Sequence, residues 1–209
     1  MNKTIQIKKR FQKNEGFTLI EIAIVLIIIG LILGAITKGR DLMRSGEQKK
    51  VYTKFLNEWR TAYLNFYDRT GKILGDTWNG TAQGQDGLAD TSAGTATTPT
   101  DDGRADLTDG DDDGTVNYYG LQDLGLNAPT TNTNNNYEYR YKDQTGADHT
   151  LKIAFANSGT SNYMSIEDIP FELKLAVDTI IDGEVSASSG YFTYSDVTTD
   201  TNASWIMDF

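Results

Sequence analysis

The sequence contains no cysteine and a single histidine, His149. Without cysteine there is no disulfide, no thiol nucleophile and no cysteine-ligated zinc, so a domain outside the cytoplasm depends on its hydrophobic core alone. One histidine excludes every site that needs two, and we interpret His149, next to Asp148 in an expected hairpin turn, as a surface residue. The chain also lacks a G-x-S-x-G, Walker or dinucleotide-binding glycine pattern, and we expect it not to be an enzyme.

Basic residues are scarce and unevenly placed. The 209 residues include 19 Lys and Arg against 29 Asp and Glu, a formal net charge of −10. Residues 1–16 hold five of the basic residues and one acid, Glu15, so the rest of the chain has 14 basic and 28 acidic residues. The chain is a basic leader joined to an acidic body, and we expect no binding to nucleic acid.

One long apolar run follows the leader. Residues 17–37 read FTLIEIAIVLIIIGLILGAIT, in which 16 of 21 residues are apolar and Glu21 is the only charge. A helix of about 20 such residues spans the ~30 Å hydrocarbon core of a bilayer. By the positive-inside rule, the basic leader stays in the cytoplasm and the acidic body lies outside. Ala35-Ile36-Thr37 is a poor match to a small-x-small cleavage site, so we expect the run to be retained as a membrane helix.

Glu21 is the anomaly within this run. A carboxylate in hydrocarbon costs at least ~2.5 to 3.5 kcal/mol on insertion scales, and this helix offers it no cationic partner. Either another chain supplies the partner, or Glu21, five residues into the run, reaches the headgroup region. The residues alone leave both alternatives open.

The junction between the leader and the apolar run resembles a known signal. Lys13-Asn14-Glu15-Gly16-Phe17-Thr18-Leu19-Ile20-Glu21 is similar to the class III signal of type IV pilins and pseudopilins: a short basic leader ending in Gly, then Phe, with Glu four residues later. The resemblance implies that a prepilin peptidase cuts between Gly16 and Phe17 and methylates the new amino group of Phe17. It also implies that Glu21 pairs with the Phe17 amine of a neighbouring subunit in a helical filament of identical chains.

The same resemblance implies partners and a location. The precursor is expected in the inner membrane, where it meets the peptidase and the assembly machinery. The assembled product is expected as an extracellular pilus or a periplasmic pseudopilus. Because the cut precedes the apolar run, the membrane helix survives processing and becomes the core of a fibre.

The helix is expected to continue past the membrane. Over residues 38–67 apolar residues recur at spacings of three and four, and most charged residues fall outside this stripe. The spacing predicts one helix over residues 17–67, about 75 Å long at ~1.5 Å per residue, with its second half packed on a domain. Gly30 and Gly34 form a GxxxG spacing that allows close helix approach, and the resemblance adds that this stretch can unwind locally in a filament.

Residues 68–209 are expected to form a globular periplasmic or extracellular domain. Residues 79–100 are rich in Gly, Thr, Ser, Asn and Asp and predict a long surface loop. Spacing predicts helical structure over 116–126, an antiparallel hairpin from 137–141 and 151–155, a helix starting at Pro170 and a strand over 191–194. An antiparallel sheet laid on the amphipathic half of the long helix gives an α+β, pilin-like fold with extended acidic loops.

A calcium loop is indicated in the most acidic part of this domain. Oxygen-bearing residues stand at the ligand positions 1, 3, 5, 7 and 9, in order Asp109, Asp111, Asp113, Thr115 through its carbonyl, and Asn117. Gly114 occupies position 6, where such loops turn sharply. Position 12 is Gly120 instead of a bidentate Glu, so this is not an EF-hand, and Asp123 or Asp76 has to complete the shell. The alternative is a solvated acidic turn.

Three functions are consistent with these features. The resemblance favours a structural subunit of a type IV pilus, since a processed filament subunit needs both the Gly16-Phe17 junction and Glu21. A pseudopilin of a type II secretion system is the first alternative, because the chain lacks the C-terminal disulfide of many major pilins. The second is a plain membrane anchor that carries a calcium-dependent binding domain.

Overall fold

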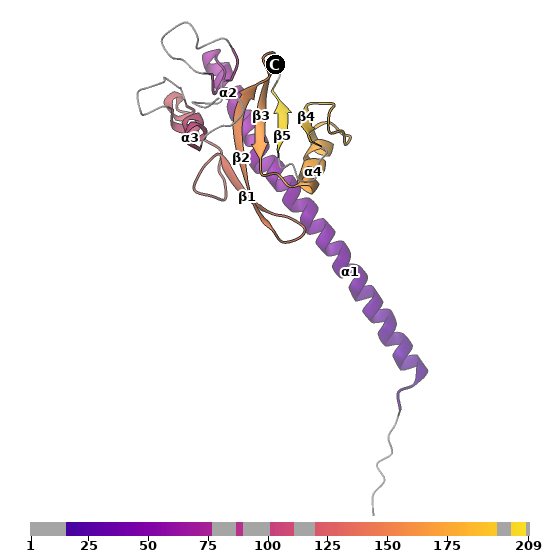
Figure 1. Ribbon diagram of the computed structural model, residues 1–209. Coiled ribbons are helices and arrows are strands. Elements are labelled where there is room, and N and C mark those ends of the chain that lie inside the picture. The colour runs from indigo at the N-terminus through magenta and orange to yellow at the C-terminus, as the bar shows by residue number, and fades with distance from the viewer. Residues whose placement is uncertain (1–15, 77–86, 90–100, 111–119, 196–201, 208–209) are drawn as a thin grey trace, which may run out of the picture. The chain divides into compact units, whose positions relative to one another are not determined.

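The computed structural model in Figure 1 describes residues 16–76, 87–89, 101–110, 120–195 and 202–207. The chain divides into two compact units, with the boundary in the sequence between Arg44 and Ser45. The first unit contains most of helix α1 (Leu19–Val51). The second contains the other described helices and strands, together with the end of α1.

Helical structure runs without a break from Leu19 to Thr70. α1 passes directly into a π-helical turn, η1 (Tyr52–Leu56), and then into α2 (Asn57–Thr70). Gly71 ends α2 in the left-handed conformation, with φ 67°, and its amide donates a hydrogen bond to the Tyr67 carbonyl at 2.7 Å. Glycine adopts this conformation at little cost because it has no Cβ. The long predicted helix is confirmed, with its start two residues and its end three residues later than expected.

The helix buries one face from Val51 onward. The adjacent residues Phe55 and Leu56 of the π-helical turn η1 are both completely buried. Burial of an apolar side chain of this size stabilises the fold by roughly 1.5 to 3 kcal/mol. The buried stripe consists of Val51, Phe55, Leu56, Trp59, Ala62, Tyr63 and Phe66.

Five antiparallel strands form the sheet that packs on this stripe (Figure 1). They are β1 (Glu138–Lys142), β2 (Asp148–Asn157), β3 (Asn162–Glu167), β4 (Phe192–Tyr194) and β5 (Ala203–Ile206), in the spatial order β1-β2-β3-β5-β4. The predicted hairpin is present as β1 and β2, with Tyr139 opposite Leu151. β4 is the predicted C-terminal strand. β3 and β5 were not predicted, and β5 lies between β3 and β4.

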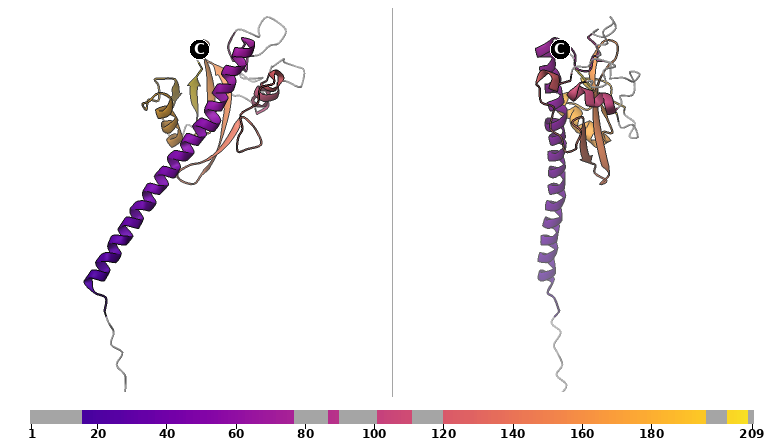
Figure 2. Two further views of the ribbon diagram at one scale, coloured as in Figure 1. Left: turned by 180° about the vertical axis from the view of Figure 1, so that it is seen from behind. Right: turned by 90° about the vertical axis from the view of Figure 1, so that its left-hand side faces the viewer.

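Aromatic rings join the helix to the sheet. The Phe155 ring of β2 lies 6.2 Å from the Trp59 ring and 4.7 Å from the Tyr63 ring, measured between centroids. The Trp59 indole N–H donates to the Asn136 carbonyl at 3.0 Å, so its polar edge is satisfied inside the core. In the edge-on view of Figure 2, the helix from Ser45 onward and the sheet form two layers, which is the predicted α+β packing.

Three further helical segments are α3 (Asp101–Asp109), η2 (Gln122–Leu124) and α4 (Phe171–Ile181). α4 begins directly after Pro170, as predicted. α3 was not predicted; its Arg104 is almost completely buried and pairs with Glu167 of β3 at 2.7 Å. The sequence predicts helical structure over residues 116–126. Residues 116–119 lie outside the described part, and among the rest the helical turn is η2, which is followed by Gly125 with φ 66°.

Residues 87–89 of the expected surface loop are held against the sheet. The Ala89 N–H donates to Asn162 Oδ1 at 2.7 Å, and Asn157 Nδ2 donates to the Ala89 carbonyl at 2.9 Å. Ala89 is buried. The surface-loop prediction is therefore wrong for this residue, because two asparagine side chains of β2 and β3 replace solvent as its partners; residues 79–86 and 90–100 lie outside the described part.

Loop residues cover both outer edges of the sheet. At β1 the Asn132 side chain imitates a paired strand: its Oδ1 accepts from the Arg140 N–H at 2.7 Å, and its Nδ2 donates to the Arg140 carbonyl at 2.8 Å. At β4 the Ala187 carbonyl accepts from the Tyr194 N–H at 2.9 Å. These backbone groups are therefore not available to a strand of another chain.

Candidate functional site

From residue 19 to residue 37 the helix is apolar on every side, and Glu21 is its only charged residue there. From Phe17 to Ile36 its large apolar side chains are between 47% and 93% exposed. A helix that is hydrophobic all round is stable when lipid or other helices surround it. Residues 19–37 of this helix are about 28 Å long at ~1.5 Å per residue, close to the thickness of a hydrocarbon core. By length and composition, the helix can therefore cross a membrane.

The predicted processing junction stands directly before this helix. Gly16, Phe17 and Thr18 have no regular secondary structure, and all three are exposed. The Phe17 side chain is 85% exposed. The peptide bond between Gly16 and Phe17 is therefore free of helical hydrogen bonding and open to a peptidase.

Glu21 caps the helix on which it lies. Thr18 donates its backbone N–H at 2.8 Å and its hydroxyl at 2.9 Å to Glu21 Oε2, and the Glu21 N–H donates back to the Thr18 hydroxyl at 3.3 Å. This arrangement is a capping box, and its Thr-x-x-Glu spacing is visible in the sequence. The capping box was not predicted, because the prediction considered only the charge of Glu21.

The capping box leaves the charge of Glu21 uncompensated. Thr18 occupies Oε2, and no hydrogen bond from the described residues reaches Oε1. Hydrogen bonds from a hydroxyl and an amide lower the cost of burying a carboxylate, but they do not neutralise it. A cation from outside this chain still has an open carboxylate oxygen to bind.

Gly30 and Gly34 lie in α1 with open space around them. A Cβ added at either position meets no atom within 4 Å, and the helix is α-helical through both. Residues four apart share one face of a helix, so the two glycines offer a place where a second helix can approach closely. Their role in packing or local unwinding stays a prediction.

The predicted calcium loop lies mostly outside the described residues. Asp111, Asp113, Thr115 and Asn117 fall within 111–119, which the structure does not describe. Asp109 is the last residue of α3 and is exposed. Within the described ranges, no three His, Cys, Asp or Glu side chains form a group that could hold a metal ion. Calcium binding therefore stays a prediction.

The residues that bracket 111–119 are held against each other. The Leu121 N–H donates to the Leu107 carbonyl at 3.1 Å. The Gly120 backbone lies so close to Gly110 that a Cβ at position 120 would overlap the Gly110 amide nitrogen. Only glycine fits this approach, which explains why position 12 of the acidic loop is not a glutamate.

The two carboxylates considered as further ligands each bind a backbone amide. Asp123 Oδ2 accepts from the Gly120 N–H at 2.9 Å, and Asp76 Oδ2 accepts from the Gly87 N–H at 3.2 Å. Asp123 is thereby tied to the end of the stretch 111–119, whereas Asp76 is tied to a different segment. Of the two, Asp123 is therefore the better placed to take part in a site there.

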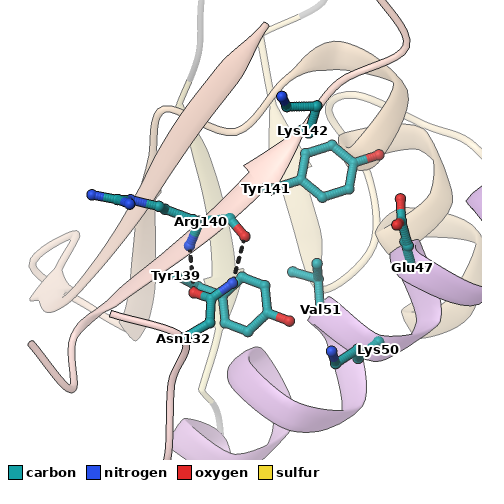
Figure 3. Close-up of a pocket in the computed structure, with 8 residues that line it drawn as sticks. All are labelled: Glu47, Lys50, Val51, Asn132, Tyr139, Arg140, Tyr141 and Lys142. Carbon is teal, nitrogen blue, oxygen red and sulfur yellow. Dashed lines mark hydrogen bonds between the residues drawn. The ribbon is translucent and has the colours of Figure 1, made fainter. Parts of the chain in front are cut away.

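A small pocket lies between the helix and the edge strand β1 (Figure 3). Its volume of about 230 Å³ is below the ~300 Å³ at which ligand sites usually begin. Figure 3 shows the rings of Tyr139 and Tyr141 directed toward the helix, whereas the Arg140 guanidinium points away from it. Burial, followed by the charge of Glu47, raises the pKa of Tyr139. The eight described residues that line it are Glu47, Lys50, Val51, Asn132, Tyr139, Arg140, Tyr141 and Lys142.

Comparison with known proteins finds a match in the N-terminal segment. Residues 11–37 match the family described as the prokaryotic N-terminal methylation motif. Gly16, Phe17 and Glu21 all lie within the matched range. No curated protein and no solved structure matches the chain. The match therefore identifies the N-terminal signal, and the function of residues 38–209 has to be argued from their own structure.

Proposed function

We propose that this chain, which carries the N-terminal methylation motif of type IV pilins and pseudopilins, is a structural subunit of a type IV pilus. It is made as a membrane-anchored precursor, is cleaved by a prepilin peptidase and assembles through its apolar helix. One observation carries most of the proposal: from residue 19 onward, the segment that matches the motif is a helix with apolar side chains exposed on every side. Such a segment can lie in lipid before assembly and among identical helices afterwards.

Glu21 gives assembly a specific contact. Cleavage after Gly16 creates a cationic amine at Phe17, and this amine has the charge that no described residue of the same chain supplies to Glu21. Two opposite charges in apolar surroundings compensate each other only when they meet in good geometry, and leaving one of them unpaired there costs about 3 to 5 kcal/mol. The free oxygen Oε1 is the atom that we expect to receive the amine of a neighbouring subunit.

The sheet supports assembly through helices rather than through strands. Asn132 and Ala187 occupy backbone groups at the two outer edges of the sheet. An exposed edge strand is the usual route by which a sheet recruits a strand from another chain. With both edges covered, most of the exposed large apolar side chains of the described residues lie on the helix, which therefore needs a partner.

The alternative is a pseudopilin of a type II secretion system. The absence of cysteine favours it, because many major pilins carry a C-terminal disulfide and this chain has none. The same processing and the same helix packing would then build a periplasmic filament.

The experiment that tests the proposal is electron microscopy of filaments sheared from cells, with mass spectrometry of their subunits. A type IV pilus subunit is expected as the main component of surface fibres. A chain found only in periplasmic material, with normal fibres on cells that lack it, would favour the pseudopilin. A chain found only in membranes, with its leader intact, would contradict both and leave a plain anchor.

We further propose that residues 109–117 bind one calcium ion, with Asp109, Asp111 and Asp113 as carboxylate ligands, the Thr115 carbonyl and Asn117. Carboxylates this close together repel one another when no cation is bound, and a hard dication removes that repulsion. The contact between Gly110 and Gly120, which brings the ends of 111–119 together, supports the proposal because a closed loop loses less entropy when it binds an ion.

The calcium proposal is tested by thermal unfolding of the full chain in mild detergent, with calcium or with a chelator. Without a bidentate Glu, the dissociation constant should be on the order of 10⁻⁵ to 10⁻³ M, so about 5 mM calcium should stabilise by roughly 1 to 4 kcal/mol. A double variant, Asp111→Ala with Asp113→Ala, should lose this stabilisation. The matched control, Asp101→Ala with Asp102→Ala, removes the same charge outside the loop and should keep it. Identical unfolding of the wild type with calcium and with chelator would contradict the proposal and show that residues 109–117 are a solvated acidic turn.

A further inference from the structure

His149, near the start of β2, stands between two carboxylates from other segments. Its Nδ1 lies 2.9 Å from Asp168 Oδ1, and its Nε2 lies 3.4 Å from Asp143 Oδ2. The imidazole side chain is only 18% exposed. The expectation of a surface histidine is therefore wrong: pairing of β2 with β1 and β3 brings both carboxylates to the ring.

Each carboxylate also organises the backbone around it. Asp143 Oδ1 accepts hydrogen bonds from the N–H groups of Thr145 and Ala147, both at 2.8 Å, and so holds the turn between β1 and β2. Asp168 Oδ2 accepts from the Thr150 N–H at 2.7 Å. The imidazole thus links the β1–β2 turn to the corner where β3 passes into α4.

Asp168 is itself held in an uncommon conformation. Its φ is +53°, and it is the one described residue other than glycine with a positive φ. Such a conformation costs a non-glycine residue on the order of 1 kcal/mol or more and persists when surrounding contacts enforce it. The bonds to His149 and Thr150 are those contacts.

We propose that His149 is a pH-operated latch, which clamps the β1–β2 turn to the β3–α4 corner when the imidazole is protonated and releases the turn when it is neutral. The reason is the number of N–H donors on the imidazole ring. An ionised carboxylate only accepts hydrogen bonds, so two carboxylates require two N–H groups on the ring, and only the imidazolium has both. A neutral ring keeps one donor, and the longer contact, to Asp143, is the one that we expect it to lose. This latch does not depend on the proposed filament function.

Two further carboxylates and one lysine lie on the segments that surround His149. Glu172 of α4 reaches the same turn and accepts from the Gln144 N–H at 3.0 Å. Asp148, next to the ring in sequence, is exposed and pairs with Lys142 at 3.4 Å. The carboxylates that raise the pKa of His149 are those of Asp168 and Asp143, which contact the ring directly.

The titration follows from these contacts. Burial by itself lowers the pKa of His149, but hydrogen bonds and charge from Asp168 and then Asp143 outweigh it, so the pKa lies above its ordinary value of 6.5. Hydrogen bonds, first of all from the Thr145 hydroxyl, lower the pKa of Asp143 to about 2, so this carboxylate stays ionised throughout. Because the pKa of His149 is raised in the folded state, the stabilisation is complete below about pH 6.5 and is lost as pH rises through the raised pKa.

The test uses the fact that this is the only histidine in the chain. NMR of the full chain in detergent micelles, labelled at histidine, gives one imidazole titration curve without assignment. We expect its midpoint to lie above the midpoint of the same chain unfolded in urea. Hydrogen exchange at Thr145 and Ala147, corrected for the intrinsic pH dependence, should accelerate severalfold across that midpoint.

Variants separate the latch from a purely structural contact. Asp168→Asn removes the nearer charge, and Asn tolerates a positive φ, so the midpoint should fall toward the unfolded value. His149→Gln should abolish the pH dependence of exchange at Thr145. The control, Asp148→Asn, removes an exposed neighbouring carboxylate and should leave the midpoint of His149 nearly unchanged. A wild-type midpoint at or below the unfolded value, or pH-dependent exchange that survives in His149→Gln, would overturn the proposal.

Discussion

Asp178, in the second half of α4, is a completely buried carboxylate. Its Oδ2 accepts a hydrogen bond from the Ser186 N–H at 2.8 Å and another from the Tyr194 hydroxyl at 3.1 Å. Burial raises its pKa, and the nearby Asp182 raises it further, whereas the two hydrogen bonds act in the opposite direction. The side chain therefore fixes the segment between α4 and β4, although its charge is unfavourable in that position.

We expect Asp178→Asn to be tolerated and Asp178→Ala to be destabilising. The Asn carbonyl oxygen can accept the same two hydrogen bonds without a buried charge, so the free energy of unfolding at pH 7 should stay within about 1 kcal/mol of the wild type. Ala leaves the Ser186 N–H and the Tyr194 hydroxyl without an acceptor and should lower the free energy of unfolding by roughly 1 to 3 kcal/mol. Urea unfolding of the full chain in mild detergent measures the difference.

The pH dependence provides the control for this pair of variants. The folded-state pKa of Asp178 is raised above the ordinary 3.8, so protonation stabilises the fold in acid, and that contribution is lost as pH rises through the raised pKa. The wild type should therefore gain stability relative to Asp178→Asn as the pH is lowered. Equal losses in the Asn and Ala variants would show that the hydrogen bonds are not what Asp178 provides.

Separation along the chain decides which single-residue contacts could be predicted. Thr18, directly before the helix, and Glu21, in its first turn, are three residues apart, so their capping box can be recognised from the sequence. His149 and Asp168 are 19 residues apart and meet only because β2 and β3 are paired in one particular register. Nothing local in the sequence specifies that register, and the contact of His149 with Asp168 could not be predicted without it.

At the scale of elements, Asn132 has one specific role, which is to cover the outer edge of β1. Its side-chain amide replaces a neighbouring strand for Arg140 of β1. Asn132→Ala removes both hydrogen bonds and should lower the free energy of unfolding by about 1 to 2 kcal/mol. It should also speed hydrogen exchange at the Arg140 amide, which can be followed by NMR in micelles.

Asn134→Ala is the matched control for this edge. Asn134 lies in the same loop and is exposed, and a surface substitution of this kind changes stability by less than about 0.5 kcal/mol. If both variants lose the same stability, the loop as a whole protects the edge, and the strand-like pairing of Asn132 is not responsible.

Elements with a local pattern were predicted, and elements without one were not. The long helix and the β1–β2 hairpin follow from periodicities of 3.6 and 2 over neighbouring residues. β5 has four residues, and its partner β3 begins about 40 residues earlier in the chain. α3 has the polar sequence DDGRADLTD, which shows no apolar stripe, and it is tied to the sheet by the ion pair of Arg104 with Glu167. Both depend on tertiary contacts that a sequence pattern does not contain.

At the scale of the whole molecule, assembly and folding depend on different residues. Glu21 lies in the first unit, and the buried core lies in the second. Glu21→Ala should therefore leave the domain as stable as the wild type but lower the yield of sheared filaments more than about tenfold, because an unpaired Phe17 amine in apolar surroundings costs about 3 to 5 kcal/mol.

Asp41→Ala is the matched control for Glu21→Ala. Asp41 is an exposed acid on the same helix, outside the apolar run, and its loss should leave filament yield near the wild-type level. A normal yield from Glu21→Ala would instead show that Glu21 reaches the headgroup region or serves the capping box alone.

The intact mass of the chain recovered from assembled filaments tests the central claim most directly. A processed filament subunit has the mass of residues 17–209 plus one methyl group, because the peptidase cleaves after Gly16 and methylates Phe17. Gly16→Leu should remain at full length in the membrane fraction, whereas Gly39→Leu, outside the matched motif, should be processed normally. Filaments whose subunits still carry residues 1–16 would contradict the account.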